Sequence, residues 1–263
     1  MKNILIHADD FGLSPGVNEA IIELGQKKRL SGTAVMSIFT ESQYKADILS
    51  QIKDFSIGLH ITLTDQILCH KSSLTDNNGK AYSLKEVIQK SQKNQLNSHD
   101  LEQEITTQIE HFHHIFNRYP DYFDGHHHVQ LLKPVRQALH QITTRLNIPV
   151  YIRNAYMPLS FGLSPKKMVL RYLNRGMQAD IQRWGWQTNS YFAGSYGSKP
   201  IAQYFKHILS LQKDNLLMMV HPGFVDEILQ SRDKMQEARK IEYDFLASDG
   251  FTQLLKKYNY HVA

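Results

Sequence analysis

Residues 3–10 read NILIHADD, an apolar run that passes within a few residues into a histidine and two carboxylates. Its apolar part, residues 3–6, is typical of a short strand that is buried on both faces of a sheet. After a polar turn, Val17, Ile21 and Leu24 recur at the spacing of one helix face. This stretch therefore predicts a strand, a polar turn and a helix in succession, and the rest of the chain repeats that order.

Short apolar runs alternate with helical patterns along the remaining sequence. We expect strands at 33–39, 55–61, 122–126, 150–153 and 216–220, and helices at 44–52, 98–118, 134–146, 165–175, 201–212 and 232–247. Repeated strand–helix units form parallel sheets with right-handed crossovers. The expected fold class is therefore α/β, a (β/α) barrel that is distorted or has fewer than eight regular units. A doubly wound open sheet is the second candidate, although no Gly-x-Gly-x-x-Gly motif supports its dinucleotide-binding form.

No linker, internal repeat or low-complexity segment divides the sequence, so we expect one domain over residues 1–263. Two long polar segments interrupt the strand–helix alternation. Residues 62–82 include the turn signal DNNG, and a connection of this length is typical of a lid or a binding loop. Residues 154–199, rich in Gly, Pro, Tyr and Ser, predict loops around the single helix at 165–175.

The composition is that of an ordinary globular enzyme, with 41% hydrophobic and 21% charged residues. The net charge of +5 is spread along the chain without a basic stripe, which argues against a nucleic-acid partner. The single Cys69 excludes an intramolecular disulfide and a cysteine-based zinc site. The first residues form no signal-peptide hydrophobic region, and no apolar run approaches the roughly 20 residues that span a bilayer. We expect a cytoplasmic protein without a membrane partner.

Four of the expected strands end in carboxylates or imidazoles. The residues concerned are Asp9, Asp10, His60, Asp124, His126, His127, His128 and His221. In α/β folds the carboxyl ends of the strands form one rim, where functional groups gather. Two imidazoles and one carboxylate leave open positions on a divalent metal ion, which lowers the pKa of bound water and polarises a carbonyl oxygen. The pattern therefore indicates a metal-dependent hydrolytic site.

Each of these residues alone has a simpler interpretation. The two aspartates suit a solvated turn, His60 suits a core or surface position, and His221 suits a turn before Pro222. Alternate side chains of an extended segment face opposite ways, so we expect His126 and His128 to share one face. The prediction of a metal site rests on the conjunction of four strand ends.

The same segments carry a family resemblance. They are ADDFGLS at 8–14, GLHITLT at 58–64, DGHHHV at 124–129 and HPGF at 221–224, with Arg239 and Glu242 in an Arg-x-x-Glu arrangement. In these motifs, which span almost the whole chain, the sequence resembles the YdjC-like (ChbG-type) carbohydrate deacetylase family.

The resemblance implies a role for each residue of the site. Asp10, His60 and His126 would bind the metal, Asp9 would be the general base on metal-bound water, and His221 would protonate the leaving amine. The implied reaction hydrolyses the N-acetyl amide of an N-acetylated sugar, of the N-acetylglucosamine or chitooligosaccharide type, to acetate and an amino sugar. The resemblance also implies one divalent ion per chain. Family members usually have Mg²⁺, whereas the ligand types here suit Zn²⁺ or another transition metal. The resemblance further implies a homodimer.

The chain departs from the family pattern at three positions. His7 stands where the family usually has Asn, Tyr122 where it has His, and Gln130 where it has a further His. None of the three removes an implied metal ligand, so they bear on the surroundings of the site and on the substrate. Two other functions remain open, a phosphoesterase with a second metal ion and a non-enzymatic sugar-binding protein on the same fold.

Several further residues have two interpretations. Arg153, at the end of a predicted strand, suits either the active-site rim or a salt bridge, and pairing with Asp9 would unite both. Trp184 and Trp186 suit either a platform for sugar rings or packing. The role of His128 is open. The histidines of the long predicted helix, at 111, 113 and 114, are expected on the solvated surface.

Overall fold

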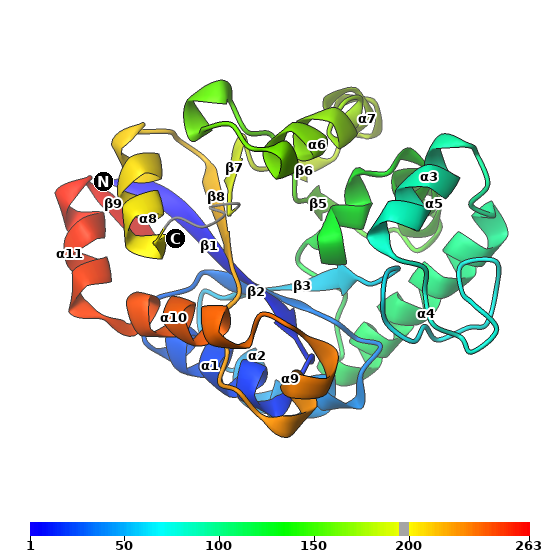
Figure 1. The fold of residues 1–263 in the computed structure, drawn as a ribbon, viewed down its shortest axis with the longest axis horizontal. Coiled ribbons are helices and arrows are strands. Elements are labelled where there is room, and N and C mark those ends of the chain that lie inside the picture. The colour runs from blue at the N-terminus through cyan, green and yellow to red at the C-terminus, as the bar shows by residue number, and fades with distance from the viewer. Residues whose placement is uncertain (195–199) are drawn as a thin grey trace.

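A computed structural model describes residues 1–194 and 200–263 as a single parallel sheet with helices around it (Figure 1). The strands are β1 (Lys2–Phe11), β2 (Gly32–Val35), β3 (Ser56–Ile61), β4 (Phe123–Gly125), β5 (Tyr151–Ile152), β6 (Gln187–Thr188), β7 (Tyr191–Ala193), β8 (Leu216–Val220) and β9 (Tyr260–Val262). They pair in the order β6-β5-β4-β3-β2-β1-β8-β7, and β9 pairs with the first residues of β1.

The order of the strands makes the sheet curl upon itself. Its two outer strands, β6 and β7, are separated in the chain only by Asn189 and Ser190, so the backbone joins the two edges directly. The Asn189 side chain donates to Asn154 O (2.8 Å) and accepts from Asn154 N (2.9 Å), which ties this junction to the end of β5. The expected distorted barrel is therefore confirmed, and the open doubly wound sheet is wrong.

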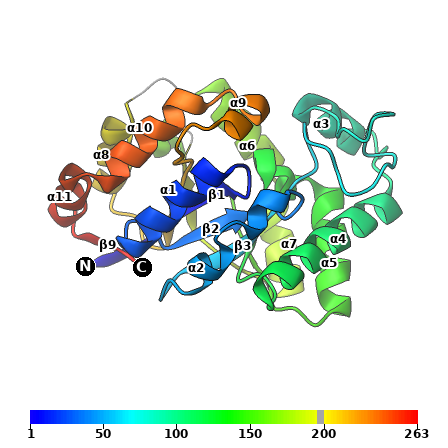
Figure 2. The same ribbon diagram turned by 90° about the horizontal axis from the view of Figure 1, so that it is seen from below.

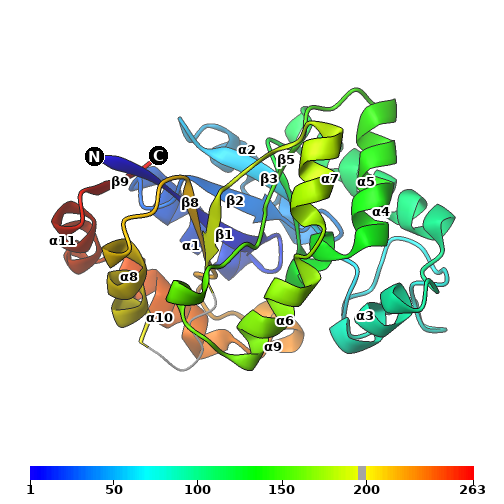
Figure 3. The ribbon, with the colours of Figure 1, turned by 90° about the horizontal axis from the view of Figure 1, so that it is seen from above.

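The helices cover the outside of the strands. They are α1 (Pro15–Gln26), α2 (Ala46–Ser50), α3 (Leu84–Gln92), α4 (Ser98–Phe116), α5 (Lys133–Arg145), α6 (Pro165–Leu173), α7 (Met177–Trp184), α8 (Ile201–Ser210), α9 (Glu227–Arg232), α10 (Gln236–Ala247) and α11 (Asp249–Lys257). Helices α1 and α10 pack side by side on one side of β1 (Figure 2), and the two chain ends lie together where β9 joins β1 (Figure 3). In the described part of the chain no helix is long and apolar enough to cross a membrane.

Hydrophobic periodicity explains the longest elements. In α4, Leu101, Ile105, Ile109 and Phe112 are each at most 1% exposed, because they form one stripe that packs against the sheet. Every predicted strand is present, but β1 continues to Phe11 and β2 stops at Val35. Short elements were not predicted, namely α3, α7, α9, α11, β6, β7 and β9. Of the segment 154–199, residues 195–199 lie outside the described residues.

Candidate metal centre

The end of β1 brings two consecutive carboxylates to the same site. In a regular strand Asp9 and Asp10 would face opposite sides of the sheet. Asp10 instead has a left-handed backbone (φ 72°), and the pairing of β1 with β2 shifts register between Ala8 and Phe11. Such a conformation costs about 1–3 kcal/mol for a residue other than glycine, and Asp tolerates it better than most. This irregular turn places both carboxylates at the rim.

The three predicted metal ligands converge. Asp10 Oδ1 lies 3.3 Å from His60 Nε2 and 3.3 Å from His126 Nδ1. One ligand atom from each of the three residues lies within 4.8 Å of the others. Asp10 and His60 are buried, and the His126 side chain is 15% exposed. A carboxylate oxygen and two imidazole nitrogens therefore point at one small volume at the rim, a donor set that suits a divalent ion.

The imidazole of His60 is oriented by a neighbouring strand. The β3–β4 register pairs His60 with Asp124, and His60 Nδ1 lies 2.6 Å from Asp124 Oδ1. Burial lowers the pKa of His60, but the carboxylates of Asp124 and Asp9 outweigh it and raise the pKa to about 10. The surroundings thus favour a positive charge on this ring, from a proton or from a metal at Nε2. A carboxylate behind a metal-binding histidine is the usual arrangement in metal sites.

The prediction for the three consecutive histidines is wrong in its geometry. Strand β4 ends at Gly125, and the next residues form a short 3₁₀ segment in which His127 (φ 53°) and His128 (φ 62°) are left-handed. His127 consequently packs at a tilt on His126, with ring centroids 4.0 Å apart, and contacts Thr64, whereas His128 is buried edge-on against Phe192. Two consecutive left-handed residues break the alternation on which the expected shared face of His126 and His128 depended.

Arg153 holds two carboxylates behind the metal centre. It is fully buried and donates to both oxygens of Asp9, at 2.8 and 2.7 Å, while its Nη2 lies 2.6 Å from Asp124 Oδ2. The two interpretations of Arg153 left open by the sequence, a place at the rim and a salt bridge, are therefore both met by its pairing with Asp9. Burial raises the pKa of Asp9, but Arg153 outweighs it and holds the pKa well below its usual range. Asp9 stays ionised in a fixed orientation.

A second group of ligand atoms, from Asp9, His60 and Asp124, is also close enough to hold a cation. Arg153 already lies against both of its carboxylates and supplies their positive charge. In the group that contains Asp10, Arg239 pairs with the other oxygen, Asp10 Oδ2, at 2.6 Å, so among the described residues no arginine or lysine lies against Asp10 Oδ1. Of the two candidate metal sites, the Asp10 group is therefore the more open to a cation.

Helix α10 supports this arrangement. Arg239 pairs with Asp233 as well as with Asp10, each at 2.6 Å. Burial raises the pKa of Asp10, but Arg239 and His126 hold it well below its usual range. One turn further along, Glu242 accepts a hydrogen bond from the backbone N–H of His221 at 2.5 Å, and burial raises the pKa of Glu242 to about 8. In the sequence, Arg239 and Glu242 were noted only because they match the Arg-x-x-Glu arrangement of the resembling family.

His221 lies at the end of β8 and faces Asp9. Its Nε2 is 4.0 Å from Asp9 Oδ2, and its side chain is 19% exposed. Burial lowers the pKa of His221 to about 4, although Asp10 and Asp9 raise it. All five predicted site residues are therefore brought together. The part played by Asp124 was not predicted, and its only signal was its position at a strand end, two residues before His126.

The two tryptophans belong to the opposite end of the barrel. Trp184 stacks on His140 of α5 at 4.4 Å and packs against Trp186 at 4.8 Å. Both precede β6, so they lie before the strand starts, whereas the site lies beyond the strand ends. This supports packing rather than a sugar platform. The three histidines at 111, 113 and 114 are exposed on α4, as expected.

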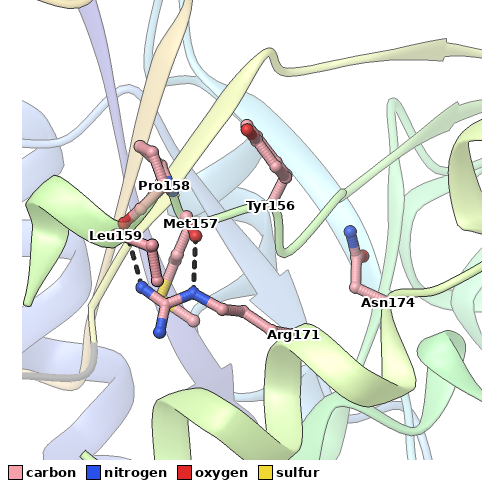
Figure 4. A pocket seen from close by; sticks show the side chains of 6 residues that line it. All are labelled: Tyr156, Met157, Pro158, Leu159, Arg171 and Asn174. Carbon is pink, nitrogen blue, oxygen red and sulfur yellow. Dashed lines mark hydrogen bonds between the residues drawn. The ribbon is translucent and has the colours of Figure 1, made fainter. Parts of the chain in front are cut away.

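Two hollows lie outside this cluster. The first, of about 240 Å³, is lined by Tyr156, Met157, Pro158, Leu159, Arg171 and Asn174 (Figure 4). The guanidinium of Arg171 in this lining is already hydrogen-bonded within the protein, since it donates to Met157 O at 2.8 Å and to Pro158 O at 2.9 Å. The second, of about 620 Å³, lies between α3 and α6. Neither lining contains a predicted site residue.

Comparison with known proteins places the whole chain in one family. A chitooligosaccharide deacetylase of Yersinia enterocolitica is 27% identical over 266 residues, covering 99% of this chain and 97% of the relative. One from Yersinia pestis is 28% identical, covering 88% and 85%. A crystal structure from Enterococcus faecalis, of a protein named for cellobiose-phosphate cleavage, has a TM-score of 0.77 at 22% identity, covering 100% and 97%, and shares the fold. The family model of the YdjC-like proteins matches residues 3–257, and the chain therefore belongs to the YdjC-like protein family.

Proposed function

We propose that this protein is a metal-dependent deacetylase. It hydrolyses the N-acetyl amide of an N-acetylated sugar, of the N-acetylglucosamine or chitooligosaccharide type, and releases acetate and an amino sugar. The observation that carries the proposal is the convergence of Asp10 Oδ1, His60 Nε2 and His126 Nδ1, each within 4.8 Å of the others. The names of the Yersinia relatives support the substrate class.

The donor set fits one divalent ion. Asp10, His60 and His126 would hold it, and their ligand types suit Zn²⁺ or another transition metal, while the family resemblance favours Mg²⁺. When bound, such an ion lowers the pKa of water and polarises the acetyl carbonyl. Asp124 keeps the His60 ring in place from behind, and Arg239 keeps Asp10 ionised.

The remaining residues move protons. Asp9, ionised and oriented by Arg153, accepts a proton from the attacking water at a carboxylate oxygen. His221 Nε2 lies 4.0 Å from Asp9 Oδ2, beyond direct hydrogen-bond distance, so the proton reaches it through one bridging water molecule. His221 then delivers it to the departing sugar nitrogen. A neutral imidazole at the start, as its lowered pKa implies, is suited to this relay.

A site with room for one metal ion favours amide hydrolysis over the phosphoesterase alternative. A phosphoesterase often needs a second metal, and the ligand atoms available for it are those of Asp9, His60 and Asp124. Arg153 neutralises both carboxylates of that group. No described residue favours the non-enzymatic sugar-binding function, since all five residues of the proposed reaction are present.

The test is acetate release from N-acetylglucosamine and from diacetylchitobiose by metal-loaded protein. We expect release that disappears on chelation and in a His126→Ala variant. A His113→Ala variant, which removes an exposed histidine from α4, is the matched control and should keep full activity. A protein that binds one metal ion yet releases no acetate from either sugar would contradict the proposal.

A further inference from the structure

A second layer of polar side chains lies inside the barrel, beneath the metal centre. Alternation along the strands places His7 two residues before Asp9, Tyr122 two before Asp124, and Tyr151 two before Arg153, on the same face of the sheet. The inward direction of His7 and Tyr122 is confirmed by a contact across the intervening strands, since their rings are 4.5 Å apart. We call His7, Tyr122 and Tyr151 the polar layer.

Two glycines make room for this contact. A Cβ on Gly58 would lie 2.5 Å from atoms of the Tyr122 ring, so the ring can cross β3 only because that position is bare. A Cβ on Gly32 would lie 3.2 Å from His7 Nε2. The tyrosine therefore reaches from β4 over β3 toward β1, and its hydroxyl ends within the barrel. Burial raises the pKa of Tyr122 well above its usual range, so the hydroxyl keeps its proton.

The polar atoms of this layer have no hydrogen-bond partner among the described residues. They are His7 Nδ1, His7 Nε2, Tyr122 Oη and Tyr151 Oη, and the Nε of Arg153 above them is likewise unpartnered. Arg153 is fully buried, and its other guanidinium nitrogens are directed at Asp9 and Asp124. Buried polar groups in native proteins are almost always satisfied, commonly by internal water held through two to four hydrogen bonds.

We propose that the polar layer binds ordered water, which accepts the Nε–H of Arg153 and bridges it to Tyr122 Oη and to His7. After accepting the Nε–H of Arg153, a water molecule has one lone pair and two hydrogens left, so it can accept from Tyr122 Oη–H and donate to the unprotonated ring nitrogen of His7. Burial lowers the pKa of His7 to about 3, so its neutral ring offers one donor and one acceptor nitrogen. His7 and Tyr122 are then positioning residues that act on Asp9 through the plane of the Arg153 guanidinium.

Among the described residues, Gln130 offers a direct alternative to water. Gln130 Oε1 is also buried without a partner, and Gln130 Nε2 already donates to Arg153 O at 3.3 Å. A rotation of this amide onto Arg153 Nε would satisfy both groups without water. His7, Tyr122 and Gln130 are also the three positions at which the sequence departs from the family pattern, and all three lie around Arg153.

The test is a crystal structure of the protein at about 1.5 Å resolution, with Tyr122→Phe beside it. We expect density for water within about 3.2 Å of both Arg153 Nε and Tyr122 Oη. In Tyr122→Phe we expect that water to be lost and the Arg153 guanidinium to lose its hydrogen bond to at least one oxygen of Asp9. Tyr260→Phe is the matched control, because Tyr260 is buried and its hydroxyl donates to Lys213 O far from the site.

Kinetics gives a second readout. On diacetylchitobiose we expect Tyr122→Phe to lower kcat about tenfold with KM unchanged, because the orientation of Asp9 and not sugar binding is altered. A wild-type crystal structure with no ordered water in the polar layer, and with Gln130 Oε1 accepting from Arg153 Nε, would overturn the proposal even if the variant does not fold. So would a Tyr122→Phe structure that keeps the same water and the same Arg153 geometry. The crystallographic outcome does not depend on the proposed deacetylase activity.

Discussion

Two groups of acidic and histidine side chains share His60, and they differ in where a neighbouring arginine lies. In the first, Asp10 and His126 join His60, and the arginine that balances the charge, Arg239, contacts the far oxygen of Asp10. In the second, Asp9 and Asp124 join His60, and Arg153 contacts both carboxylates. The residue types are nearly the same. The position of one guanidinium decides which group is open to a cation and which is a closed ion-pair network.

The largest expected effect separates the two neighbouring aspartates. Asp10→Asn should abolish metal binding and lower acetate release about a thousandfold or more, because it removes a charged ligand. Asp9→Asn should lower acetate release to a similar extent but keep one bound metal ion per chain, because it removes only the proton acceptor. Metal analysis of the purified variants beside the activity assay checks both. If Asp9→Asn lost the metal and Asp10→Asn kept it, the two groups would have been assigned the wrong way round.

Removing the Arg153 guanidinium should make the second group, which contains Asp9 and Asp124, accessible to a cation. Arg153→Met leaves Asp9 buried without its ion-pair partner and leaves Asp124 with His60 alone, so we expect a loss of about 3–5 kcal/mol in the free energy of unfolding at pH 7. Urea denaturation measures it. Arg136→Met is the matched control, since Arg136 is equally buried and pairs with Asp180 on α7.

The two arginine variants differ in how they respond to metal. A divalent ion can replace the lost charge only beside Asp9 and Asp124, so added metal should recover more stability in Arg153→Met than in Arg136→Met. Equal recovery in the two variants would show that Arg153 does not keep the second group closed.

A smaller effect is expected behind His60. Asp124→Asn keeps the shape of the side chain but weakens the bond to His60 Nδ1, so the affinity for metal should fall about 10–100-fold. Isothermal titration calorimetry measures the change. Asp121→Asn, which removes a carboxylate two residues before β4 and away from the site, is the control and should bind metal normally. Unchanged affinity in Asp124→Asn would remove Asp124 from the support of the metal centre.

The smallest effect is a dependence on pH that metal should suppress. The pKa of His60 is raised to about 10 in the folded chain, above its ordinary value of about 6.5. Its protonation therefore stabilises the metal-free fold fully below about pH 6.5, and this stabilisation is lost as the pH rises toward 10. Glu242, with a pKa of about 8, acts in the same direction.

Chelated protein should accordingly lose up to roughly 1.4 kcal/mol per pH unit from His60 between pH 7 and 10. Metal-loaded protein should lose less, because Nε2 then binds the ion instead of a proton. Urea midpoints measured across this range with and without metal make the comparison. Parallel curves for the two forms would contradict a metal ligand at His60.

The fold was predictable where hydrophobic runs were long enough. The strand 216–220 matches β8 residue for residue, and the stripe of α4 is visible in the sequence. Strands such as β6, with only Gln187 and Thr188, carry no such pattern, because their pairing depends on β5 and on the junction at Asn189. Barrel closure is therefore a property of distant contacts rather than of local sequence.

The site was predictable in its residues but not in its geometry. Asp10, His60 and His126 were identified because polar groups directly after buried strands gather at one rim. The left-handed backbone at Asp10 and His127 was not predictable, since neither position carries glycine and nothing in the pattern specifies a positive φ. The bond between His60 and Asp124 depends on the register of two strands that are far apart in the sequence.

The most direct test of the metal centre is anomalous diffraction from crystals soaked in Zn²⁺. The two groups share His60 but lie on different sides of it, so the position of the ion distinguishes them. We expect one anomalous peak about 2.0–2.2 Å from Asp10 Oδ1, His60 Nε2 and His126 Nδ1. A peak between Asp9 and Asp124, or no peak at the strand ends, would contradict the account.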